Sequence, residues 1–166
     1  MLSKATLANL EFSDEFEEDT DICSNCGSDT ETLIGYNEKL NLFKYECKNC
    51  QTVTVVDDES GKRIIIEGKK RDWEEFFSKN LAFPFEGVID EYSDEEFFGK
   101  SVALRFGDRV TVTKIIYEDD LYGVLVEIKK GRRKYHFPLC DIAVADKKSS
   151  DYKKVDDYRT WFANCR

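Results

Sequence analysis

Four cysteines form two Cys-x-x-Cys pairs, Cys23 with Cys26 and Cys47 with Cys50, and twenty residues separate the pairs. Each pair can direct two thiolates at one metal ion, and two pairs complete the tetrahedral coordination that Zn²⁺ prefers. The residues between the pairs read as strand, turn and strand, so the second pair folds back onto the first. Two disulfides are the alternative. We favour zinc, because this spacing is typical of structural zinc sites. The pattern predicts a zinc ribbon, which does not by itself define a function.

A second set of candidate ligands consists of acidic residues at turns in the C-terminal half. Glu118, Asp119 and Asp120 lie in the turn between two expected strands, and the next hairpin, residues 129–133, is basic. Because hairpin strands alternate in direction, the chain then returns and brings Asp141 towards the acidic turn. Glu86 would begin at the same end if its strand is antiparallel to the next one. The pattern therefore predicts an acidic end and a basic end of one sheet.

Converging carboxylates suit a hard cation such as Ca²⁺, which binds about six to eight oxygen atoms. Without a cation, acids that meet from separate loops repel one another. The alternative is that these side chains are simply solvated, as Asp commonly is in hairpin turns. The twelve-residue EF-hand loop is absent from the sequence. Calcium binding is therefore a hypothesis that spacing alone leaves open.

The elements that must position these groups follow from hydrophobic periodicity. The expected zinc ribbon has alternating strands separated by turns, and Asp72 with Glu75 forms a capping box for a helix within residues 69–82. Five short strands follow, with a long early connection that contains one helical turn at 93–99. A final amphipathic helix carries Val155, Tyr158, Trp161 and Phe162. The expected strands are 30–36, 40–46, 52–56, 63–67, 85–89, 110–117, 122–128, 134–137 and 142–144.

These elements predict a mainly β fold with flanking helices (α+β), in which a zinc ribbon precedes an SH3-like small β-barrel. We divide the chain into a flexible acidic segment (1–22), the ribbon (23–68) and the barrel domain with its flanking helices (69–166). Residues 1–22 carry seven acids and one lysine, and the chain has a net charge of −9. This acidity argues against nucleic acid or an anionic membrane as partner and suits metal ions or a protein partner. No apolar run approaches the ~20 residues of a membrane span, so we expect a cytoplasmic protein.

Four separated motifs resemble the small bacterial calcium-binding proteins of the CcbP type. The motifs are Phe83–Glu86, Tyr122–Val126, Tyr135–Asp141 and Asp156–Asn164, and the resemblance covers about residues 80–166. It implies a non-enzymatic, cytoplasmic Ca²⁺ buffer or sensor. The acids at matching motif positions are Glu86, Asp141, Asp156 and Asp157, whereas Glu118, Asp119 and Asp120 fall in a variable turn.

Two alternatives to calcium binding remain open. Asp156 and Asp157 could instead complement the dipole at a helix N-terminus. The whole chain could be a non-catalytic zinc-ribbon adaptor for protein or nucleic acid whose calcium site has been lost. The single histidine, His136, and the cysteine Cys140 are expected to be structural, since no nucleophile–base pair or phosphate-binding loop accompanies them. No enzyme is therefore expected.

Overall fold

The computed structural model describes residues 2–15, 19–90 and 104–165. Two compact units are present: unit 1 comprises Met1–Arg71 with Ala163–Arg166, and unit 2 comprises Asp72–Phe162. The helical turn expected at 93–99 lies outside the described residues. Among those described, no helix is long and apolar enough to cross a membrane.

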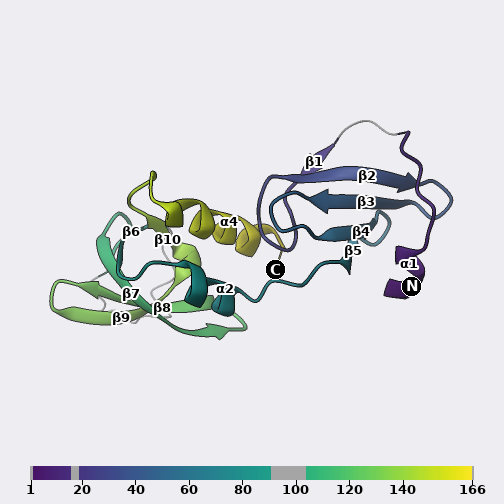
Figure 1. The fold of residues 1–166 in the computed structure, drawn as a ribbon. Helices are drawn as coiled ribbons and strands as arrows, with labels where there is room; N and C mark the ends of the chain where they lie inside the picture. Colours follow the sequence, from purple (N-terminus) through teal and green to yellow (C-terminus); the bar gives the residue numbers. More distant parts are fainter. Residues whose placement is uncertain (1, 16–18, 91–103, 166) are drawn as a thin grey trace. The chain divides into compact units, whose positions relative to one another are not determined.

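Unit 1 is built on an antiparallel meander in which each strand pairs with the next one along the chain (Figure 1). The tight turns between the strands explain this order, because strands joined by short hairpins pair directly. The strands are β1 (Thr20–Asp21), β2 (Glu31–Asn37), β3 (Leu42–Cys47), β4 (Val53–Asp57) and β5 (Lys62–Glu67).

The N-terminal residues also belong to unit 1. Helix α1 (Lys4–Ala8) is capped by the Ser3 side chain, and Leu7 is buried with Leu42 and Val55 in a small apolar core. Residue 13 forms a β-bridge with Tyr36. Where the sequence predicted a flexible segment over residues 1–22, these residues contact the sheet. The run of acids obscured the apolar side chains that dock this segment on the sheet.

Unit 2 contains a second antiparallel sheet with the strand order β10-β6-β7-β8-β9. The last strand in sequence thus pairs with the first, while β7, β8 and β9 form a meander (Figure 1). The elements are α2 (Trp73–Asn80), β6 (Phe85–Ile89), β7 (Arg109–Asp119), β8 (Gly123–Lys130), β9 (Arg133–Pro138), the 3-10 helix η1 (Leu139–Asp141), β10 (Ile142–Val144) and α4 (Ser150–Cys165).

The core of unit 2 joins the sheet to its two helices through aromatic side chains. Asp72 caps α2 by accepting a 2.8 Å hydrogen bond from the Glu75 N–H, as the capping box predicts. The Trp73 ring packs 5.0 Å from Tyr158, and the Phe77 ring packs 5.2 Å from Tyr158 (centroid distances). All three side chains are almost completely buried. The helices are therefore part of the unit 2 core.

The mainly β architecture with flanking helices is confirmed, whereas a closed barrel is not seen. Across the described part of unit 2, β9 and β10 are the two edges of the sheet and no strand pairing joins them. The chain leaves β9 through Pro138 and η1, and the three-residue β10 pairs with β6. Because of this turn and this short strand, β9 and β10 do not pair and the described sheet is not closed into a barrel.

Candidate metal centre and acidic residues

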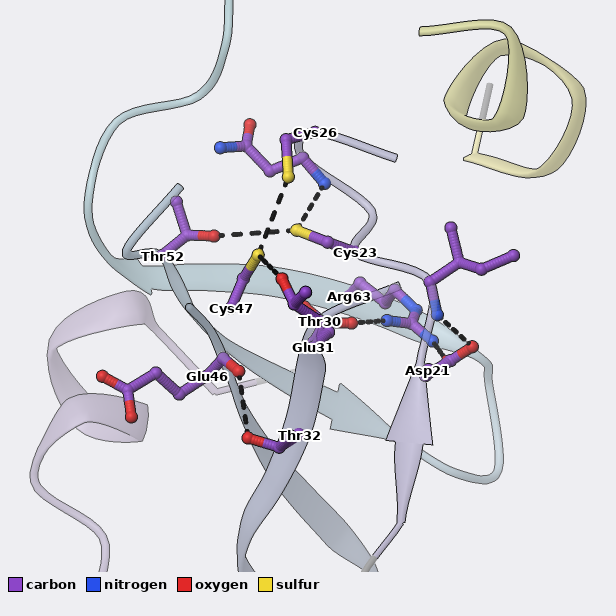
Figure 2. A network of polar contacts seen from close by, with 12 residues as sticks. Asp21, Cys23, Cys26, Thr30, Glu31, Thr32, Glu46, Cys47, Thr52 and Arg63 are labelled. Carbon is purple, nitrogen blue, oxygen red and sulfur yellow. Dashed lines mark hydrogen bonds and ion pairs between the residues drawn. The ribbon is translucent and has the colours of Figure 1, made fainter. Parts of the chain in front are cut away.

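The four cysteines meet in unit 1. Their sulfur atoms all lie within 4.8 Å of one another, and the Cys23–Cys50 and Cys26–Cys47 sulfur pairs are each 3.6 Å apart. Zn–S bonds of about 2.3 Å in a tetrahedron place sulfurs about 3.8 Å apart, so the cluster has the dimensions of a four-thiolate site. These separations exceed an S–S bond, and the cysteines are free thiols. Figure 2 shows Cys23 and Cys26, from one turn, converging on Cys47 from another.

Each cysteine pair sits on a turn of the same construction. The residue after each pair, Gly27 or Gln51, has a left-handed backbone with φ of 72° or 58°. Its N–H donates a 2.8 Å hydrogen bond to the carbonyl of the first cysteine of that pair, Cys23 or Cys47. Glycine adopts this conformation readily, whereas it is uncommon for a residue with a side chain such as Gln51. The two turns therefore aim both sulfurs of each pair inward.

Polar groups around the sulfurs favour bound thiolates. The Asn25 N–H and the Asn49 side-chain amide donate hydrogen bonds of 3.4 Å to the sulfurs of Cys23 and Cys26, respectively. Hydrogen bonds to Cys26 and Cys50, followed by burial, raise the pKa of Cys23. Hydrogen bonds from Cys23 and Cys26 lower the pKa of Cys50. The Cys50 thiolate is thus stabilised by the S–H groups of its neighbours. A bound divalent cation would take the place of those protons.

An ion network with one buried carboxylate lies beside the cysteines (Figure 2). Arg63 on β5 donates to Glu31 on β2 at 2.7 Å and also to Asp21 on β1. The Glu31 side chain is 0% exposed, and its second oxygen, Oε1, has no hydrogen-bond partner. Burial raises the pKa of the Glu31 carboxyl, while Arg63 opposes that rise. Glu31 is directly opposite Cys47 in the β2–β3 ladder. This network was not predicted from the sequence, because a lone Glu in a strand is normally exposed.

In the predicted acidic turn, the Glu118 N–H donates a 3.1 Å hydrogen bond to the Glu74 side chain, and Asp119 bonds to its own turn. Asp119 Oδ1 accepts N–H groups from Leu121 and Tyr122 at 2.8 and 2.9 Å. Glu118 and Asp120 are exposed. Asp119 thus shapes the turn as Asp commonly does, which agrees with the alternative that these are ordinary turn acids.

Asp141 and Glu86 lie at different ends of the unit 2 sheet. The neighbour of Asp141, Cys140, places its sulfur 3.9 Å from the Tyr122 carbonyl, so Asp141 is at the end that holds the acidic turn. Glu86 instead pairs with Thr111, which pairs with Lys129 of the basic hairpin. The expectation for Glu86 was wrong, because β6 pairs only with the first residues of the long β7.

Asp156 and Asp157 lie inside α4, which begins at Ser150. Neither acid is at the helix N-terminus, so the proposed dipole role does not apply to them. Asp157 is buried and forms an ion pair with Lys153 at 2.5 Å. The helix starts earlier than its apolar residues indicated, and the Ser149 hydroxyl accepts a hydrogen bond from the Asp151 N–H at its first turn.

A family model described as calcium binding (Calci_bind_CcbP) matches residues 50–162. The chain belongs to the CcbP calcium-binding family. The match covers about two thirds of the chain and contains all seven candidate calcium ligands, whereas Cys23, Cys26 and Cys47 precede it. No curated protein and no solved structure matches the chain.

Membership of the CcbP family supports calcium binding, while the described side chains do not form a gathered acidic site. Among the residues that the structure describes, the four cysteines are the one group of three or more potential ligands close enough to hold a metal ion. Asp90 was not among the predicted site residues, and its N–H donates a 2.9 Å hydrogen bond to the Asp141 carbonyl. Arg159 on α4 pairs with the Asp90 carboxylate and donates to the Cys140 carbonyl. Asp90 is thus a further acid beside Asp141.

Proposed function

We propose that the chain is a non-enzymatic Ca²⁺-binding protein of the cytoplasm, a buffer or a sensor, which carries a structural zinc ribbon in residues 23–68. The CcbP family match is the observation that carries the calcium part. The four-sulfur cluster supports the zinc part, since its ligand type and dimensions suit Zn²⁺ and not Ca²⁺, which prefers oxygen. The two ions would therefore occupy different units of the chain.

For calcium, the acidic end of the unit 2 sheet is the proposed location. Asp119 and Asp120 come from one turn and Asp141 from another at this end, and backbone carbonyls there could complete an oxygen shell. The SH3-like description remains a proposal for residues 69–166. It is supported by the strand order, which puts the fifth strand beside the first, and by the 3-10 turn before the last strand.

Isothermal titration of metal-stripped, zinc-reloaded protein with CaCl₂, with MgCl₂ as control, tests the calcium proposal. Saturable binding that Mg²⁺ does not reproduce is expected. The double variant Asp119→Asn/Asp120→Asn should bind calcium more weakly, because it removes two negative charges from the acidic end. Asn at position 119 still offers an oxygen to the turn.

Glu86→Gln is the matched control, since it removes a carboxylate from the opposite end of the same sheet. Its calcium affinity should stay close to that of the wild type. Unchanged affinity in the 119/120 double variant would remove that turn from the site. No heat and no thermal stabilisation with millimolar-range calcium would mean that this member lacks the ion site. The zinc-ribbon adaptor would then be the better description.

A further inference from the structure

The metal centre and its surroundings carry an unusual amount of negative charge for a buried site. Four thiolates around one divalent cation leave a net charge of −2 on the centre. Glu31 adds a carboxylate whose side chain is completely buried, and Asp21 stands opposite Glu31 in the neighbouring ladder. An uncompensated charge in such a place is strongly unfavourable. The positive charge that contacts both carboxylates is Arg63.

Strand register places this network next to the sulfurs. Glu31 is the direct partner of Cys47, and side chains of directly opposed residues project from the same face with Cβ atoms about 5 Å apart. Thr30, the residue before Glu31, has its hydroxyl 3.6 Å from the Cys47 sulfur. Figure 2 shows the Thr30–Cys47 contact and the Arg63–Glu31 pair. The carboxylate and the thiolates are therefore close enough to repel through a poorly screened interior.

The Asp21–Arg63–Glu31 network is not explained by folding stability alone. A buried ion pair is commonly no better than a well-packed apolar pair, and here Glu31 Oε1 is also left without a partner. In metal sites, by contrast, residues around the ligands often tune metal affinity. A role towards the metal explains why an acid with one unsatisfied oxygen is held beside the cysteines.

We propose that Arg63 is a positioning residue of the metal centre, which neutralises Glu31 next to Cys47 and thereby sustains metal affinity. This inference rests on the proposed four-cysteine metal site. When Arg63 is removed, Glu31 becomes an uncompensated anion beside a centre of charge −2, and metal binding weakens. When Glu31 is made neutral as well, the need for Arg63 disappears.

Cobalt titration of the full-length, metal-stripped protein measures this dependence through the thiolate-to-Co²⁺ charge-transfer absorption. Competition with Zn²⁺ then gives the zinc affinity. Arg63→Met should lower the affinity by about 10- to 100-fold, the usual effect of losing a group that supports the ligands. Glu31→Gln/Arg63→Met should restore most of that loss. Because Glu31→Gln would also relieve a purely structural loss, affinities are compared only between variants that circular dichroism shows to be folded.

Lys62→Met is the matched control. Lys62 precedes Arg63 on β5, carries the same charge and is exposed, so its loss should leave metal affinity unchanged. If Arg63→Met alone does not fold, Glu31→Gln is compared with Glu31→Gln/Arg63→Met. In the neutral background, removal of Arg63 should change the affinity little, and a loss of about tenfold or more there would overturn the proposal.

The possible failures are distinguishable. Wild-type protein without thiolate–cobalt absorption would refute the metal centre and, with it, the role of Arg63. Wild-type protein that binds cobalt, together with an Arg63→Met variant of equal affinity, would refute the role of Arg63 alone.

Discussion

The hydroxyl of Tyr158 accepts a 2.8 Å hydrogen bond from the backbone N–H of Val124. Both residues are completely buried, so this bond fixes α4 against the start of β8. Gly123 makes the approach possible. A Cβ atom at position 123 would lie 2.2 Å from the Tyr158 hydroxyl and 2.6 Å from the Phe162 ring. The close packing of helix on strand thus depends on a residue without a side chain.

Gly123→Ala is therefore expected to destabilise unit 2 more than Gly131→Ala does. Both glycines have positive φ, 67° and 61°, so each alanine costs about 1–2 kcal/mol of backbone strain. At Gly131 an added Cβ meets nothing within 4 Å, whereas at Gly123 overpacking adds about 1–3 kcal/mol. Urea unfolding followed by tryptophan fluorescence compares the two variants. Equal losses of stability would show that α4 yields easily at this contact.

Removal of the metal should unfold unit 1 and leave unit 2 folded. A structural zinc ion contributes on the order of 10 kcal/mol to a small domain, and the apolar core of unit 1 is small. Both tryptophans, Trp73 and Trp161, lie in unit 2, so their fluorescence reports on that unit. With a chelator or with Cys47→Ser, we expect loss of β signal in far-ultraviolet circular dichroism at unchanged fluorescence. Simultaneous loss of both signals would show that the two units unfold together.

Affinity of the cysteine site for metal should fall as the pH falls. Neighbouring thiols and burial raise the pKa of Cys23, so the metal-free cluster holds protons that the ion must displace. Because binding releases protons, acidification favours the metal-free form. Cobalt titrations at several pH values measure the slope of log affinity against pH. A slope of zero would mean that the thiols are already ionised before the metal binds.

Much of the fold was predictable because its signals are local. Alternating side chains and tight turns located the strands, and the Asp72 cap located α2. The Cys-x-x-Cys spacing similarly identified residues that the structure brings together, because each pair is held by its own turn.

The remaining features depend on contacts between distant residues. Burial of Leu7 is decided by the sheet that it meets, and the position of Glu86 by how far β6 extends along β7. Periodicity gives the face of a strand but not its register with a partner. For the same reason, the Glu31–Cys47 pairing became visible only in the folded chain.

The strand order of unit 2 also constrains how the chain folds during synthesis. β6 obtains its second neighbour only when β10, more than fifty residues later, has left the ribosome, and the core still needs Tyr158. At about 5–20 residues per second, one edge of β6 therefore waits for several seconds without its partner strand. Unit 1 has no such delay within its sheet, since each strand pairs with the one made just before it.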